Sequence, residues 1–344
     1  MKRVLNNLLS GRLALALLLS AGAGAQSLDV RIESAGVTHL YAAAGDSVPY
    51  QIYVETDSAA HQGLAMFAMD LVYSGGDLTQ VTPSLDVASF VSPLGVNNPA
   101  GYGGTPHLGD LLQVGGAQNT IKNSFAPQPT GTVALSLAMP GSPLLVGSGS
   151  VVAPLIPGIY TLEASNLFAN VVDAASTGNP YWKVVPCAPG NLSGLTIEVL
   201  DCAPTVVCAG TTNSMGCTAS VGWSGVPSAS GGSGLTIQAT DLLNEVLAVY
   251  VWHTAPGPLP AYNTNLCVAG GFHFLRLPGL SGGGGTPATT CAGSATVTLD
   301  SVWFAANALP PGRTVYIQAL YRDPFHPTGQ SVQLSPGLSF VVCP

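Results

Sequence analysis

Apolar side chains recur at every second position in nearly all apolar segments of this chain, and this alternation limits the fold more than any other feature. In 48–56, Val48, Tyr50, Ile52 and Val54 share one face, and the residues between them face the other way. A period of two is typical of a β-strand with one buried face. After residue 26, no segment combines a period of 3.6 residues with caps at both ends, so the pattern predicts an all-β protein.

The same alternation extends over many further segments, which clusters of Gly, Pro, Asn and Ser separate. We expect strands at 28–34, 48–56, 66–74, 132–139, 158–165, 195–200, 235–243, 246–254, 271–278, 295–304, 313–323 and 338–344. Short strands separated by such turns are typical of antiparallel β-sandwiches. The stretch 92–116 is rich in Gly and Pro, and we interpret it as a long surface loop.

Residues 1–25 have the features of a secretory signal peptide. Basic residues precede the apolar run 13–20, and Ala23-Gly24-Ala25 supplies the small residues of a cleavage site. The apolar run is much shorter than the roughly 20 residues that span a bilayer. We therefore expect cleavage before Gln26, no membrane span, and a secreted protein that is extracellular or held at the cell surface.

Only 8% of the residues are charged, and the balance is acidic. Without the three basic residues of the leader, six basic residues remain beside 17 acidic ones, which gives a net charge of about −11 with neutral histidines. A chain of this sign has no basic stripe for phosphates and is repelled by anionic lipid surfaces. We expect no nucleic acid and no membrane as a partner, and a surface protein or a polysaccharide instead.

All seven cysteines lie in the second half of the chain. An exported protein meets oxidising conditions, which favour disulfides, and no Cys-x-x-Cys pair points to zinc or redox chemistry. The candidates for disulfides are Cys202, Cys208, Cys217, Cys267, Cys291 and Cys343. By sequence order the plausible pairs are Cys208 with Cys217, Cys267 with Cys291, and Cys343 with Cys202 or Cys187. The connectivity stays open at this point, and an odd number leaves one thiol free or linked to another chain.

The cysteines also indicate where the chain divides. We place a domain boundary near residue 203, which separates an N-terminal β-sandwich at 27–201 from a disulfide-stapled β-sandwich at 203–344. The first module then depends on its core alone, and the second on a core with disulfide staples.

Three short motifs stand out after residue 208. They are Asn-Ser-x-Gly-Cys at Asn213, Ser214, Gly216 and Cys217, Gly-x-Pro-Ser at Gly225, Pro227 and Ser228, and the pair Arg322 and Asp323. With these motifs, the segment 203–344 resembles a cysteine-bearing β module that recurs at the C-termini of large exported bacterial proteins. The resemblance implies an extracellular accessory role and no particular activity.

The first half carries a different framework. It has a Gly-Asp turn at 45–46, an apolar strand that ends in Tyr73, a Gly-x-Tyr-x-Leu strand at 158–162 and a closing strand at 195–200. In this order of elements it is similar to a cohesin-like β-sandwich. The resemblance implies binding of protein modules or sugars through a sheet face, but it transfers no site residue because the match lies in the framework.

Patterns that would indicate catalysis are weak in this chain. The segment 279–283 matches Gly-x-Ser-x-Gly at Ser281, but four glycines follow where a nucleophile elbow needs a helix. The acidic residues are scattered singly, so no pair suggests a glycosidase. His253 and His273 lie on neighbouring expected strands, and we favour structural hydrogen bonds over a metal pair. We expect no catalytic residue, no metal and no cofactor, although a weak calcium site assembled from distant loops stays open.

A few polar and aromatic residues need their own interpretation. In the turn at 321–324 we expect Asp323 to accept backbone N–H groups and Arg322 to pair with a carboxylate. Tyr181 and Trp182 are the candidate ligand-contacting aromatics, because an exposed pair could stack on a sugar, although core packing is favoured. The other tryptophans, Trp223, Trp252 and Trp303, are expected in the core.

These observations together predict an exported, non-catalytic protein with a structural, protein-binding or adhesive role. One alternative is a carbohydrate-binding protein with an aromatic platform. A second alternative is a hydrolase whose active site is assembled from dispersed residues.

Overall fold

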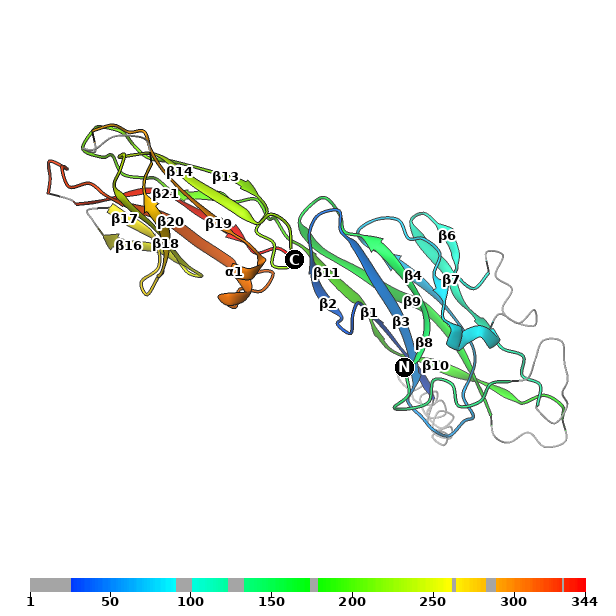
Figure 1. Cartoon of the computed structure of the whole chain (residues 1–344). Helices are drawn as coiled ribbons and strands as arrows, with labels where there is room; N and C mark the ends of the chain where they lie inside the picture. Colours follow the sequence, from blue (N-terminus) through cyan, green and yellow to red (C-terminus); the bar gives the residue numbers. More distant parts are fainter. Residues whose placement is uncertain are drawn as a thin grey trace, which may run out of the picture. The chain divides into compact units, whose positions relative to one another are not determined.

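The structure is a computed structural model that describes residues 26–90, 101–122, 133–173, 179–261, 264–282, 289–329 and 331–344. Its regular structure is almost entirely β, with one short α-helix and one 3-10 helix in the described part (Figure 1). The predicted all-β class is confirmed. The expected signal peptide lies outside the described residues, and no described helix is long and apolar enough to cross a membrane.

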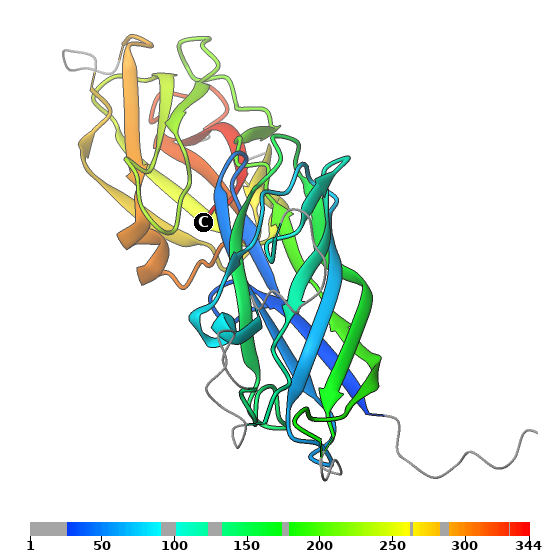
Figure 2. The same cartoon turned by 90° about the vertical axis from the view of Figure 1, so that its right-hand side faces the viewer.

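The strands of the first half belong to one hydrogen-bonded sheet. They are β1 (Ser27–Glu33), β2 (His39–Ala42), β3 (Ser47–Thr56), β4 (Leu64–Tyr73), β5 (Thr82–Pro83), β6 (Thr105–His107), β7 (Asp110–Ala117), β8 (Leu144–Val152), β9 (Gly158–Val172), β10 (Val184–Ser193) and β11 (Leu195–Val199). The order is β5-β8-β3-β1-β10-β9-β4-β7-β6, with β11 beside β9 and β2 beside β11. The alternate residues that the sequence predicted to face inward on β3 are all buried. Figure 2 shows these strands from a second side.

Strand β10 changes partners along its length and so joins the two parts of this sheet. Its first half pairs antiparallel with β9, where Cys187 lies opposite Ala169. Its second half pairs parallel with β1, where Ala188 lies opposite Ser27. Pro186 and Pro189 flank the change, and proline removes a ladder donor where continuous pairing would need one. The parallel pair departs from the purely antiparallel sandwich that the sequence predicted.

Cys187 lies at this change of partners and is the free cysteine of the chain, all seven cysteines being described. Its thiol is buried and donates to the Gln26 carbonyl oxygen at 3.4 Å. Burial raises the pKa of this thiol to about 11, and the nearby carboxylates of Asp57 and Asp29 add to the rise. Because the thiolate is the reactive form, Cys187 is unsuited to nucleophilic chemistry or to a link with another chain.

We predict that Cys187 does not react with a thiol reagent in the folded protein. The native protein should release none of the coloured thiolate of an aromatic disulfide reagent. The denatured but unreduced protein should release one equivalent of that thiolate per chain. Cys187→Ser is the matched control, since it should abolish the reaction in denaturant. Rapid stoichiometric labelling of the native protein would contradict the burial.

The second half forms three smaller sheets. Their strands are β12 (Thr205–Cys208), β13 (Ser220–Gly225), β14 (Leu235–Leu242), β15 (Leu247–His253), β16 (Pro256–Ala261), β17 (Thr264–Val268), β18 (His273–Leu280), β19 (Gly293–Leu299), β20 (Thr314–Arg322) and β21 (Val332–Val341). A five-stranded sheet has the order β12-β21-β20-β15-β18, a three-stranded sheet has the order β13-β14-β19, and β16 and β17 form a hairpin.

The five-stranded sheet is covered on both faces. On one face, its residues Tyr250 and Ile317 belong to the main apolar core with Ile237 of the three-stranded sheet. On the other face, Val251 packs with Leu266 of the β16–β17 hairpin in a second cluster. Each face of the five-stranded sheet therefore packs against another β layer, as in a sandwich.

Three disulfides staple this half, and they join Cys202 to Cys343, Cys208 to Cys267 and Cys217 to Cys291. Their Cα–Cα distances are 6.0, 6.3 and 6.4 Å, within the usual range. The expected pairs of Cys208 with Cys217 and of Cys267 with Cys291 are wrong, whereas Cys343 does reach back to Cys202. Sequence order fails because strand pairing brings distant segments together: Cys208 ends β12, and Cys267 lies on β17.

Contacts divide the chain into two compact units. The first includes the chain up to Thr38, Pro49–Val151 and Thr161–Thr196, and the second comprises His39–Val48, Val152–Tyr160 and Ile197–Pro344. Short segments of the first half thus belong with the second unit. The division into modules at 27–201 and 203–344 stays a prediction.

Some expected elements are corrected by the structure. The stretch 92–116 is not a single loop, because 105–117 forms the β6–β7 hairpin with buried Leu111 and Val114. The described part of 132–139 contains no strand, and a 3-10 helix covers Leu85–Phe90. The expected strand 295–304 ends at Leu299, where the Asp300 side chain accepts the Trp303 N–H at 2.8 Å and so begins helix α1 (Ser301–Ala306).

Candidate functional site

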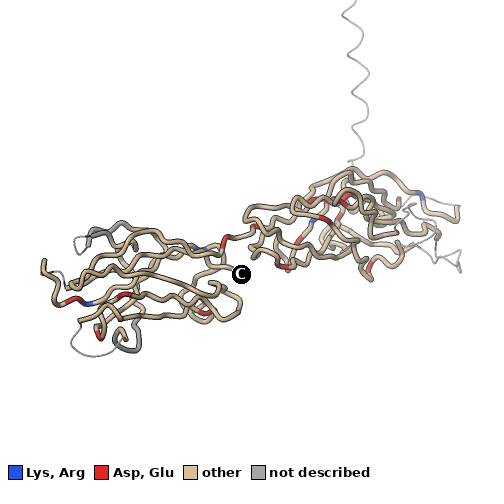
Figure 3. Tube along the Cα trace, turned by 90° about the horizontal axis from the view of Figure 1, so that it is seen from above, with Lys and Arg blue, Asp and Glu red and all other residues tan. Residues whose placement is uncertain are grey.

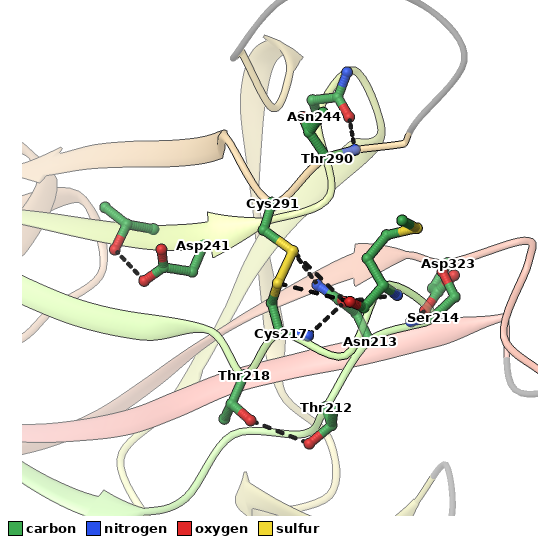
Figure 4. The surroundings of a disulfide bond; sticks show 12 residues. Thr212, Asn213, Ser214, Cys217, Thr218, Asp241, Asn244, Thr290, Cys291 and Asp323 are labelled. Atoms are coloured by element: carbon green, nitrogen blue, oxygen red, sulfur yellow. Dashed lines mark hydrogen bonds between the residues drawn. A yellow bond between two sulfur atoms is a disulfide. The ribbon is translucent and has the colours of Figure 1, made fainter.

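The motif at 213–217 forms a compact loop, here called the Cys loop, which the Cys217–Cys291 disulfide ties to the segment before β19 (Figure 4). Buried Asn213 organises it: its Oδ1 accepts the N–H groups of Met215 at 3.0 Å and Cys217 at 3.1 Å. The Asn213 N–H in turn donates to the Cys217 carbonyl oxygen at 2.8 Å. Gly216 has a φ of +81°, a conformation that glycine adopts without strain. The motif therefore encodes a turn.

The Arg-Asp motif meets the Cys loop from the far end of β20. Asp323 is 0% exposed, and its Oδ2 accepts the Ser214 N–H at 2.7 Å (Figure 4). Its Oδ1 accepts the Phe325 N–H at 3.3 Å. Asp323 therefore accepts backbone N–H groups as the sequence predicted, whereas Arg322 is exposed and none of the ion pairs between described residues includes it, so its expected carboxylate pair is not formed. Two motifs that lie far apart in the sequence thus form one contact.

Further polar groups are buried around this contact. Tyr321 and Gln333 lie opposite each other on β20 and β21, and both side chains are buried. Burial raises the pKa of Tyr321 to about 12, while the nearby Asn213 side chain lowers it and Asp323 raises it. In the described structure, Ser214 Oγ, Tyr321 OH and Gln333 Nε2 are buried and make no hydrogen bond of normal geometry.

We predict that Asn213→Ala lowers the free energy of unfolding by about 1–3 kcal/mol, because two N–H groups of the Cys loop lose their acceptor. Chemical denaturation of the oxidised protein measures this loss. Asn179→Ala is the control, since Asn179 is exposed and accepts the N–H of Tyr181. Equal losses in the two variants would contradict the role given to Asn213.

A second polar cluster lies on the outer face of β4, β7 and β9. The Asp70 carboxylate accepts the Gln113 N–H at 2.9 Å and the Asn166 side-chain N–H at 2.7 Å. The register shifts beside Asp70 in both strand pairs, and Gln113 and Asn166 have φ values of +57° and +50°. Asp70 therefore lies between two β-bulges and joins them. Bulges re-aim side chains and are frequent next to functional sites.

A hollow of about 390 Å³ lies over this cluster. It is lined by Met66, Ala68, Met69, Asp70, Gln113, Asn166 and Phe168. The Phe168 ring is 51% exposed, so an apolar surface borders carboxylate and amide groups. Ligand sites combine apolar surface with a few convergent polar groups in this way. The sequence did not point to this hollow, because the bulges that bring Gln113 and Asn166 to Asp70 have no clear sequence pattern.

Another hollow, of about 240 Å³, lies on β1, β3 and β10. Its charged groups already have partners within the protein. Arg31 pairs with Glu33 and lies 5.2 Å from the centre of the Tyr53 ring, and Asp29 accepts the Asn191 N–H at 2.7 Å. Asp70 also has partners, but its hollow is bordered by Phe168, which is half-exposed, and this exposed ring makes it the better candidate for a ligand.

Tyr181 and Trp182 differ in their surroundings. Tyr181 is 48% exposed, whereas Trp182 is half-buried against a small apolar cluster that includes Val172. The Lys122 ammonium lies 5.3 Å from the centre of the Trp182 ring. The two rings thus do not share one environment, and their role in ligand contact stays a prediction.

The remaining tryptophans and the histidine pair lie in the second half. Trp252 is buried, Trp303 is partly buried on α1, and Trp223 is 42% exposed on β13, so the core assignment of Trp223 is wrong. His273 stacks on Trp252 with the ring centres 4.7 Å apart, and its ring centre lies 6.4 Å from that of His253. No group of three or more His, Cys, Asp or Glu residues gathers as a metal site in the described parts of the chain.

Ser281 and His61 are buried in structural roles. The Ser281 hydroxyl donates to the Leu243 carbonyl oxygen at 2.6 Å and accepts the Val246 N–H at 3.1 Å, while Gly283 of that motif lies outside the described residues. His61 lies in no sequence pattern that indicates a function. Its Nδ1 accepts the Gly63 N–H at 2.9 Å, and burial lowers its pKa.

Comparisons with known proteins assign no family. No protein-family model matches the chain, and no curated protein matches its sequence. Two similar solved structures are the native conformation of E. coli alpha-2-macroglobulin (13% identity, 92% of this chain, TM-score 0.18) and a Salmonella alpha-2-macroglobulin mutant (11% identity, 93% of this chain, TM-score 0.17). This chain spans 17% of the length of each.

A third similar structure contains two tandem V-type regions of a v-region-containing chitin-binding protein. It is 12% identical, with 92% of this chain and 99% of that chain covered and a TM-score of 0.14. All three likenesses are too weak to assign a topology or a function.

Proposed function

We propose that the protein is exported and acts outside the cell as a non-catalytic binding protein with a structural or adhesive role. Its ligand would lie on the outer face of β4, β7 and β9. The observation that carries this proposal is the hollow at Asp70, where the exposed Phe168 ring borders three polar side chains.

The three disulfides support action outside the cell. Disulfides persist in oxidising compartments and are rare in the cytosol. The features of residues 1–25 agree with export, since a basic segment, an apolar run and a small-residue cleavage site follow one another.

The surroundings of the candidate catalytic residues support a non-catalytic role. Ser281 is a buried hydroxyl engaged with two backbone groups. The described tyrosines with raised pKa, which include Tyr50, Tyr250 and Tyr321, are buried core residues, and desolvation is the main cause in each. Such groups differ from the converging acids and bases of a hydrolase.

The hollow also favours a second candidate function, which is carbohydrate binding. Phe168 can stack on the apolar face of a sugar ring, while Asp70 and Asn166 can hydrogen-bond its hydroxyl groups. The same face can hold a protein surface.

Acidic residues are concentrated in the first half, since only Asp241, Glu245, Asp300 and Asp323 of the 17 follow Cys202 (Figure 3). This charge favours a ligand that is neutral or basic.

The test is binding of the purified protein to cellulose, to chitin, and to intact and protease-treated envelopes of the cell that makes it. Phe168→Ala should weaken binding by roughly tenfold or more, because an exposed ring that contacts a ligand contributes strongly. Phe274→Ala is the matched control, since Phe274 on β18 exposes the same ring type.

The outcomes separate the alternatives. Binding that protease treatment abolishes identifies a protein partner, and binding that survives it identifies a polysaccharide. Full binding by Phe168→Ala would reject this face, and the absence of wild-type binding to every surface would reject the binding role.

A further inference from the structure

Asp323 poses an electrostatic problem that its hydrogen bonds do not fully resolve. Its carboxylate is 0% exposed, and none of the ion pairs between described residues includes it. Aspartate is almost never fully buried without a charged partner, and buried charges are paired or coordinate metals. Two backbone N–H groups, from Ser214 and Phe325, offset part of the cost.

Polar groups that keep unused hydrogen-bonding capacity lie near this carboxylate, and the Asn213 side chain is close enough to Tyr321 OH to lower the pKa of that phenol. Tyr321 OH and Ser214 Oγ are buried and make no hydrogen bond of normal geometry in the described structure. The Gln333 amide lies across the strand pair from Tyr321, and its nitrogen has no partner either. Because an amide can rotate, Gln333 can present its oxygen at the same place. A carboxylate also has about four acceptor positions, of which the two N–H groups occupy two.

We propose that the buried polar groups around Asp323, beside the Cys loop, bind a hard, oxygen-coordinated cation such as Ca²⁺ or Na⁺. Asp323 is its anionic ligand, and Tyr321, Ser214 and Gln333 supply neutral oxygens. Carboxylate, hydroxyl and amide oxygens are the donors that hard cations prefer. This site is independent of the ligand face at Asp70.

The ligand groups also determine the affinity of the site for the cation. A single carboxylate makes it weak, in the range of extracellular calcium modules, about 10⁻⁴ to 10⁻³ M. Bound there, the cation would hold the Cys loop against β20 and β21. Its effect should therefore appear as stability of the C-terminal half.

The experiment is thermal unfolding of the full protein after chelation, in CaCl₂, NaCl and choline chloride at matched ionic strength. The unfolding midpoint should rise saturably, by roughly 5 °C, in the salt of the cation that binds. Asp323→Asn should show no rise. Asp241→Asn is the control, because Asp241 is exposed in the same half, and it should respond like the wild type.

Two further measurements keep the test decisive if Asp323→Asn does not fold. Tyr321→Phe removes one hydroxyl and should shift the midpoint curve to higher cation concentration. Equilibrium dialysis of the wild-type protein at millimolar concentrations of the stabilising cation should show one bound cation per chain above the level in the buffer. Equal midpoints in all three salts, or an undiminished response in Asp323→Asn, would overturn the proposal.

Discussion

The contact between the Asp323 carboxylate and the Ser214 N–H joins the beginning and the end of the C-terminal half. The Cys loop follows the edge strand β12, while Asp323 directly follows β20, the central strand of the five-stranded sheet. A charge-assisted hydrogen bond of 2.7 Å in a buried setting is about twice as strong as a neutral one. The Cys217–Cys291 disulfide and the hydrogen bonds of Asn213 hold the same loop.

The two halves of the chain are stabilised differently. Three disulfides hold the second half, and each bridge of this kind contributes about 2–4 kcal/mol. The first half has no disulfide and depends on a continuous sheet in which β10 exchanges β9 for β1. Its outer face is distorted at Asp70 by two bulges, and there it offers an exposed ring and polar groups. A stapled half and a half that carries the proposed ligand face agree with the proposed role as an exported binding protein.

Alternation made much of the fold predictable, because a strand with one buried face needs apolar residues at every second position. Val48, Tyr50, Ile52 and Val54 are buried as this rule requires. The rule does not specify which strands become neighbours, and so the partners of Cys208 and Cys217 were misassigned. The rule also missed helix α1, because apolar residues continue through Trp303 and were assigned to a strand. Asp300, a good N-cap residue, was the available signal for the helix. The hollow at Asp70 depends on two bulges, which have no recognisable pattern in a single sequence.

Amide hydrogen exchange at Ser214 tests most directly whether Asp323 holds the Cys loop to the sheet. The Ser214 N–H should exchange slowly in the oxidised wild-type protein, at a rate close to that of the β14 amides. In Asp323→Ala it should exchange roughly ten to a hundred times faster than in the wild type, as expected for the loss of a bond to a charged group, while the β14 amides stay slow. Fast exchange at Ser214 in the wild type, or an unchanged rate in Asp323→Ala, would contradict this account.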